Sequence, residues 1–224
     1  MTQIICIAFI AALLSLDTTA FGQFMVSRPI VSATIIGYFL GNVMTGLWMG
    51  ITVELIWIGS IPMGAAIPIE TTAVAILSVV WAVMVRPFDR AGVILALALS
   101  IPAGMLFRKF DILVRYVNVK IMHWVEEGVM VGSEKRISIG IYSGLGLFFL
   151  KSFILYLIVI YPGQIAVNLL YHQLSHKILA GLRLAWVLLP VLGMGFLLVN
   201  TRDGKFPCNK IEEIRQKGHG DERN

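Results

Sequence analysis

The stretches of this chain that carry no charged side chain constrain its fold more than any other feature. No Lys, Arg, Asp or Glu occurs in residues 29–53, 71–85, 91–107 or 184–201. Several of these stretches approach the ~20 apolar residues that a helix needs to cross a bilayer, and the others are shorter. In lipid only helices and closed barrels satisfy their backbone hydrogen bonds, and these stretches lack the alternation of barrel strands. We therefore expect an all-α membrane protein, a polytopic helical bundle.

Composition and charge distribution support a membrane protein. The chain is 58% apolar and 14% charged, whereas soluble domains average roughly 45–50% and 25%. The net charge of +5 is typical of cytoplasmic basic loops rather than of nucleic-acid binding, because the 18 Lys and Arg residues are clustered. Most of them lie in residues 108–136 and 202–223, which the positive-inside rule places in the cytoplasm.

The chain divides into a membrane transport domain, residues 1–200, and a polar cytoplasmic tail, residues 201–224. The first apolar segment, residues 3–16, lacks the positive start of a signal peptide, so we expect it to be retained. Residues 30–58 are too long for one upright span and too short for two, which predicts a tilted or broken helix. In all we expect about six or seven apolar segments.

The second half of the chain is predicted to alternate between apolar and polar segments. A span, a cytoplasmic amphipathic helix, a further span, a polar link and a last span are expected at residues 91–107, 108–136, 137–160, 161–177 and 178–200. The amphipathic helix should end near Gly128, where its regular spacing of apolar residues stops. Lys151 interrupts the span that follows.

The window GSIPMGAAIPIETT, residues 59–72, places helix-breaking residues inside an apolar region. Pro62 and Pro68 disfavour a continuous helix, and the small residues around them allow close backbone approach. Broken backbone at membrane depth is tolerated only where it is buried in protein or lines a wet cavity. Transporters use such breaks to expose backbone groups to a polar substrate. We predict a broken helix or re-entrant segment near residues 59–70, followed by a partial span at 71–85.

Glu54 lies just before this window and Glu70 lies inside it. A carboxylate in an apolar run is functional by default. A sugar hydroxyl can donate a hydrogen bond to a carboxylate. The candidate substrate-binding residues are Glu54, Trp57, Gly59, Gly64, Ala65, Ala66 and Glu70. Alternatives remain open: Glu54 can pair with Lys151 or Arg28, Glu70 can cap a helix, and the window can be a plain turn.

No catalytic residue, metal site or cofactor is predicted. The histidines have no metal-ligand spacing and no base is paired with a nucleophile. No glycine-rich loop precedes Lys and Ser or Thr, so nucleotide hydrolysis is not expected. Cys6 and Cys208 stand at opposite ends of the chain and suggest neither a disulfide nor a metal site.

The succession LD, a spacer and RPIV, followed by GYFLGNVMTGLWMGITVELIWIGSIPMGAAIPIETTAVAIL, resembles the membrane IIC subunits of the mannose–fructose–sorbose family of bacterial sugar phosphotransferase systems. The resemblance covers roughly residues 1–200 and is densest in residues 16–80. It is carried by Asp17, Arg28, Pro29, Gly41, Thr45, Gly46, Gly50, Glu54, Leu55, Gly59, Gly64, Ala65 and Ala66.

The resemblance implies a sugar-translocating permease in the bacterial inner membrane. Such a subunit binds and imports a hexose or amino sugar that a partner IIB protein phosphorylates. It works with a IID membrane subunit and with the phosphocarrier proteins IIA and IIB, whose histidines carry the phosphate. We also expect an oligomer, with the tail in the cytoplasm.

Two departures from the family pattern keep other functions open. Pro62 stands in the stretch before GAA where family members commonly have an amide, and Glu70 only approximates an expected acidic position. A polar sequence beginning NTRDGKFPCNK follows residues 178–200, where family chains usually continue with apolar segments. The alternatives are a shortened or divergent assembly subunit without independent transport, and an ion-coupled carrier that uses Glu54.

Overall fold

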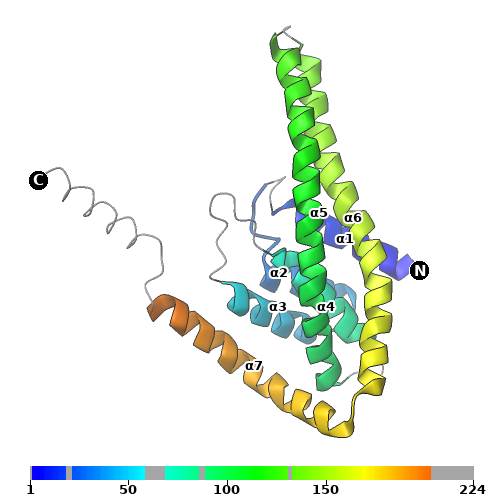
Figure 1. The fold of residues 1–224 in the computed structure, drawn as a ribbon, viewed down its shortest axis with the longest axis vertical. Helices are drawn as coiled ribbons and strands as arrows, with labels where there is room; N and C mark the ends of the chain where they lie inside the picture. The colour runs from blue at the N-terminus through cyan, green and yellow to red at the C-terminus, as the bar shows by residue number, and fades with distance from the viewer. Residues whose placement is uncertain (1, 19–21, 59–68, 86–88, 131–132, 203–224) are drawn as a thin grey trace, which may run out of the picture.

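The computed structural model describes residues 2–18, 22–58, 69–85, 89–130 and 133–202, and this part of the chain forms seven helices. The helices are α1 (Thr2–Leu16), α2 (Pro29–Phe39), α3 (Val43–Trp57), α4 (Thr71–Met84), α5 (Arg90–Met130), α6 (Glu134–Gln173) and α7 (His176–Arg202). Helices α1 to α4 cluster beside a long pair formed by α5 and α6, and α7 runs obliquely from the base of that pair (Figure 1). The expected all-helical fold is confirmed.

The apolar run 30–58 is a broken helix, as predicted. Helix α2 ends at Phe39, and Gly41 adopts a positive φ of 75° that favours glycine. Asn42 then starts α3, because its side chain accepts a hydrogen bond from the Thr45 N–H at 3.3 Å. The break turns α3 back against α2.

Glycines set how closely α2 and α3 approach. A Cβ on Gly46 would lie 2.5 Å from the Ala33 carbonyl oxygen, and one on Gly50 would lie 2.7 Å from the Ile30 Cα. Only a residue without a side chain fits at these distances. The glycine spacing of the sequence therefore acts as a small-residue helix interface.

Helix α4 is the centre of the protein. It packs against α1, α2, α3, α5 and α6, and every residue from Thr72 to Ala82 is buried. Its 14 residues span only ~21 Å, so the partial span expected at 71–85 is a helix enclosed by other helices. Residues 59–68, which contain most of the predicted break, lie outside the described residues, and α3 and α4 end and begin on either side of them.

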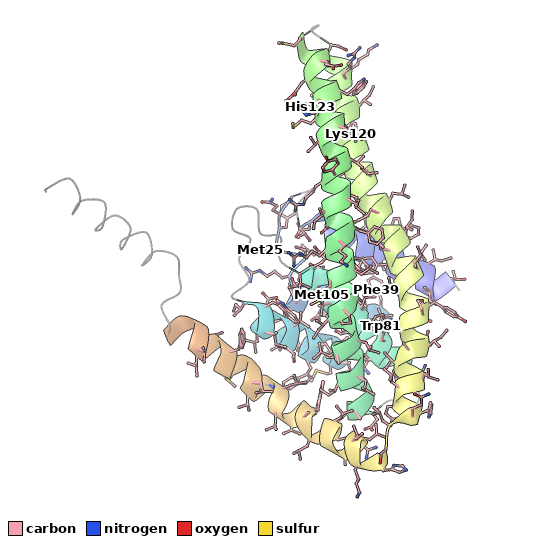
Figure 2. All side chains as sticks on the ribbon, viewed as in Figure 1. Met25, Phe39, Trp81, Met105, Lys120 and His123 are labelled. Atoms are coloured by element: carbon pink, nitrogen blue, oxygen red, sulfur yellow. The ribbon has the colours of Figure 1, made fainter. Side chains whose placement is uncertain are left out.

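The amphipathic segment 108–136 is not a separate helix. Its first part continues α5, which ends at Met130, close to the predicted end at Gly128. The 41 residues of α5 reach ~62 Å, about twice the ~30 Å of a bilayer core. Lys120 and His123 therefore lie far from the α1–α4 cluster, on what we call the outer half of the α5–α6 hairpin, residues 112–130 and 134–150 (Figure 2).

The polar link predicted at 161–177 is wrong, because α6 continues through Pro162 to Gln173. A proline inside a helix costs about 3 kcal/mol, and packing against α4 and α5 offsets this cost. Next to the proline, the indole N–H of Trp81 donates to the Ile160 carbonyl at 3.0 Å. A Cβ on Gly163 would overlap the Trp81 ring, so the glycine gives the indole its space.

Three of the described helices, α5, α6 and α7, are long and apolar enough to cross a membrane. Helix α7 packs against α3 and α5, but most of its side chains are exposed. Apolar side chains of this kind face lipid or a partner protein in a membrane. The four shorter helices reach lengths below a full span and rely on the long ones for enclosure.

Candidate substrate site

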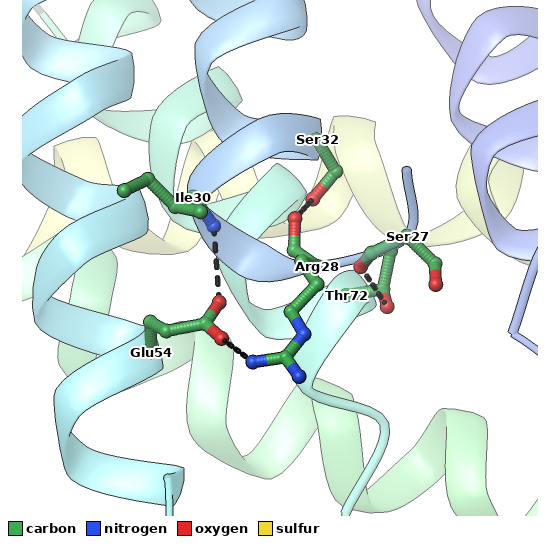
Figure 3. Close-up of polar contacts among 6 residues, drawn as sticks. All are labelled: Ser27, Arg28, Ile30, Ser32, Glu54 and Thr72. Carbon is green, nitrogen blue, oxygen red and sulfur yellow. Dashed lines mark hydrogen bonds and ion pairs between the residues drawn. The ribbon is translucent and has the colours of Figure 1, made fainter. Parts of the chain in front are cut away.

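Glu54 joins the last turn of α3 to the start of α2. Arg28 donates from its Nη1 to Glu54 Oε1 at 2.7 Å, and the Ile30 N–H donates to Oε2 at 3.3 Å (Figure 3). The first N–H groups of a helix have no partner within the helix, so this carboxylate caps α2 from outside. Of the alternatives left open by the sequence, pairing with Arg28 is confirmed and pairing with Lys151 is wrong.

The Arg28–Glu54 pair is still accessible. The Arg28 side chain is 48% exposed and that of Glu54 is 16% exposed. A carboxylate has about four lone-pair sites, so Glu54 keeps acceptor capacity beyond these two hydrogen bonds. Trp57, one turn further on, packs against the hydrophobic core, and its contact with a sugar remains a prediction.

Hydrogen bonds hold the ends of four helices together at this place. The Asp17 carboxylate, just after α1, accepts from the N–H groups of Phe24 at 2.7 Å and Ser27 at 3.1 Å. The Ser27 carbonyl in turn accepts from Thr72 Oγ1, in the first turn of α4, at 2.7 Å (Figure 3). Residues Ser27 and Arg28 therefore bridge the end of α3 and the start of α4.

Glu70 stands at the N-cap position of α4, but its side chain makes no capping hydrogen bond. The expected position at the start of a helix is therefore confirmed, without a capping hydrogen bond from the side chain. Its Oε1 atom is buried and has no hydrogen-bond partner among the described residues. Asp111, Lys151 and Arg115 are the ionisable groups that act on its carboxyl.

The sequence analysis did not identify the ion pair between Asp111 on α5 and Lys151 on α6, whose side chains are 7% and 8% exposed. Asp111 was assigned to a solvated amphipathic segment. The sequence feature that points to this ion pair is Lys151, because a cation inside an apolar span needs a partner.

Gly59, Gly64, Ala65 and Ala66 lie outside the described residues. The structure places Glu54 and Trp57 immediately before this segment, Glu70 immediately after it, and the Ser27–Arg28 bridge beside both ends. Arg28 and Glu54 before the segment offer a donor and acceptors to a polyhydroxylated ligand, and Glu70 after it offers a further acceptor.

Comparison with known families decides what this arrangement belongs to. Residues 1–202 match the family described as "PTS system sorbose-specific iic component". The chain belongs to this family. It is thus a multi-pass IIC component of the mannose–fructose–sorbose group of sugar phosphotransferase transporters, as the sequence resemblance indicated.

Related IIC proteins match most of the chain at low identity. The "PTS system mannose-specific EIIC component" of Escherichia coli (strain K12) is 26% identical over 201 residues, covering 89% of this chain and 74% of that protein. The "Fructose permease IIC component" of Bacillus subtilis (strain 168) is 26% identical over 196 residues, covering 88% and 71%.

A solved structure shows the same fold. The "CryoEM Structure of Mannose Transporter ManYZ and Microcin E492 (MceA) complex" contains a chain with a TM-score of 0.65 and 23% identity, covering 97% of this IIC chain and 87% of that one. A second structure, "Structure of membrane protein", has a TM-score of 0.73 at 22% identity. The arrangement of α1 to α7 is therefore shared with chains of these two solved structures.

Proposed function

We propose that this IIC chain binds and imports a hexose or amino sugar that a partner IIB protein phosphorylates. The chain itself contributes the sugar site and the path, and the phosphoryl group travels through IIA and IIB. Membership of the IIC family over residues 1–202 supports this proposal. Relatives carry names that specify mannose, fructose, sorbose and N-acetylgalactosamine, so the family covers sugars of this kind.

One observation carries the location of the sugar site: at the start of α4, a carboxyl oxygen of Glu70 is buried and has no hydrogen-bond partner in the described part of the chain. An unpaired buried acceptor costs about 1–3 kcal/mol, and a sugar hydroxyl would satisfy it. The segment directly before Glu70 supplies the remaining contacts. The proposed site consists of Glu54, Trp57, Gly59, Gly64, Ala65, Ala66 and Glu70.

The Arg28–Glu54 pair forms the other side of this site. Sugar hydroxyls both donate and accept hydrogen bonds, so a guanidinium and a carboxylate side by side suit neighbouring hydroxyls. Because Glu54 also caps α2, its first role is to fix this end of the site. Glu70 has one carboxyl oxygen without a hydrogen-bond partner among the described residues.

The expected partners follow from the same proposal. A IID subunit accompanies the chain in the membrane, and the fold shared with a structure titled for the mannose transporter ManYZ supports this. The outer half of the α5–α6 hairpin and the tail face the cytoplasm, where the basic residues are favoured and where IIA and IIB act.

Uptake by membrane vesicles tests the function. Vesicles with this chain, its IID partner, IIA, IIB and the phosphocarrier proteins that pass phosphate from phosphoenolpyruvate to IIA are given labelled mannose, fructose, sorbose and N-acetylgalactosamine, with and without phosphoenolpyruvate. We expect phosphoenolpyruvate-dependent uptake of at least one sugar, recovered as its phosphate. Vesicles without this chain are the control. If a correctly assembled complex shows no uptake, the chain is an assembly subunit without independent transport. Uptake driven by an ion gradient alone would indicate an ion-coupled carrier.

A pair of variants tests the site. Glu70→Gln replaces one carboxyl oxygen of this acceptor with an NH2 group, which cannot accept a hydrogen bond from the sugar, so KM should rise by up to roughly tenfold. Glu127→Gln makes the same substitution at an exposed position on the outer half of α5 and should leave KM unchanged. An unchanged KM for Glu70→Gln would remove Glu70 from the site.

A further inference from the structure

Three ionisable side chains meet where α4, α5 and α6 come together. Asp111 and Lys151 form an ion pair in which both side chains are buried. The Glu70 carboxyl lies against that of Asp111, within reach of a hydrogen bond. Lys151 therefore acts on two carboxyl groups, and Arg115 also acts on that of Glu70.

Helix packing fixes this group. Gly104 of α5 faces the first turn of α4, since a Cβ there would lie 3.4 Å from the Glu70 carbonyl oxygen. Asp111 follows two turns later on the same face of α5. Between them, the Phe107 ring contacts that of Tyr156 on α6, with 4.7 Å between the ring centroids. The α5–α6 contact thus sets Asp111 and Lys151 beside Glu70.

Lys151 has more contacts within this group than Glu70 has. Lys151 is bonded to Asp111, and its ammonium also lies 4.3 Å from the centre of the Phe148 ring. Glu70 is left with an oxygen that is buried and unpaired among the described residues. A buried cation always requires a counter-charge, so without Asp111 the ammonium would turn to the nearest remaining carboxylate, that of Glu70.

We propose that Asp111 is a positioning residue for the sugar: by holding Lys151, it keeps the Glu70 carboxylate free to accept a sugar hydroxyl. This inference rests on the proposed function. It assigns a role in affinity to two residues, one turn or more from the helix break, that make no contact with the sugar.

The inference predicts a loss and its reversal. In Asp111→Asn, Lys151 pairs with Glu70 and competes with the sugar, so KM for uptake should rise about tenfold while the maximal rate and the amount of protein stay near those of the parent. In Asp111→Asn/Lys151→Gln the competitor is absent, and KM should return to within about twofold of the parent value.

The measurement uses the assembled complex in vesicles and whichever of mannose, fructose, sorbose and N-acetylgalactosamine the parent takes up. The matched control is Asp89→Asn/Arg183→Gln, which neutralises another interhelical ion pair of 2.8 Å away from Glu70. This control should keep the parent KM. If the single variant fails to reach the membrane, the double variant alone decides.

Two results would overturn the inference. One is a parent-like KM in Asp111→Asn. The other is a raised KM or a reduced amount of protein in the double variant, which would show that the ion pair serves stability. A parent complex that takes up none of the sugars would instead contradict the proposed function.

Discussion

Helix α4 and the outer half of the α5–α6 hairpin are both rich in large apolar residues, yet they use them in opposite ways. Leu77 and Val80 of α4 are 0% exposed, whereas Leu113 and Tyr142 of the hairpin are 60% and 74% exposed. On an amphipathic helix, exposed apolar side chains face the membrane interface or a partner protein rather than the core of their own chain. Hydropathy therefore does not tell which helix is the core of this protein, and enclosure by neighbouring helices does.

The largest expected effect separates the two regions directly. Leu77→Ala opens a cavity in α4 and should lower the free energy of unfolding by about 2–3 kcal/mol, near the low end for buried leucines because lipid is apolar. Leu113→Ala on the hairpin should change it by less than about 0.5 kcal/mol. Thermal unfolding in detergent measures both. Equal losses would mean that the outer half is also enclosed.

A glycine pair makes the same comparison for close packing. Gly46→Ala places a Cβ 2.5 Å from the Ala33 carbonyl oxygen, and the forced separation of α2 and α3 should cost about 1–2 kcal/mol. Gly146→Ala on the hairpin meets no atom within 4 Å and should stabilise the helix slightly. The yield of monodisperse protein and the unfolding midpoint report the difference. A tolerated Gly46→Ala would show that the two helices can part without loss.

The Arg28–Glu54 pair tests whether the ends of the core helices serve structure or binding. Glu54→Ala removes the acceptor of the Ile30 N–H and should cost about 1 kcal/mol, since the exposed Arg28 adds little. Glu54→Gln keeps an acceptor oxygen and should cost less, and adding Arg28→Gln should change stability little further because Arg28 is half exposed. Unchanged stability with reduced uptake would instead indicate direct sugar binding. Normal uptake by Glu54→Ala would exclude that role.

The smallest effect is expected at the base of the hairpin, where Asp89 accepts hydrogen bonds from Arg183 and Tyr171. Burial raises the pKa of Asp89, but hydrogen bonds from Arg183 and from the Arg90 N–H outweigh it and hold the pKa below its usual range. The stability this adds is present above the unfolded pKa of about 3.9 and is lost as pH falls through the folded pKa.

Asp89→Asn should therefore flatten the acid side of the stability profile, with a small amplitude because Arg183 is 54% exposed. Unfolding midpoints between pH 6 and pH 3 measure it. An identical acid limb in parent and variant would show that the pair contributes nothing.

Much of this protein follows from local sequence. The charge-free stretches predict membrane helices, the length of residues 30–58 predicts a tilted or broken helix, and the ordered motif from Asp17 to Ala66 indicates the family. These features depend on residues close together in the chain. Backbone conformation, helix capping and solubility in lipid are determined by neighbouring residues in the chain, so they can be predicted from the sequence.

Contacts between distant residues were decided only by the tertiary structure. The polarity of residues 161–177 predicts a link, yet α6 continues to Gln173 because it packs against α4 and α5. Charge alone does not determine which carboxylate pairs with Lys151. The register of the α5–α6 hairpin selects Asp111, forty residues away. Coulomb attraction and packing depend on separation in space rather than in sequence. The sequence therefore shows which charged residues need partners, and the tertiary structure determines which residues those partners are.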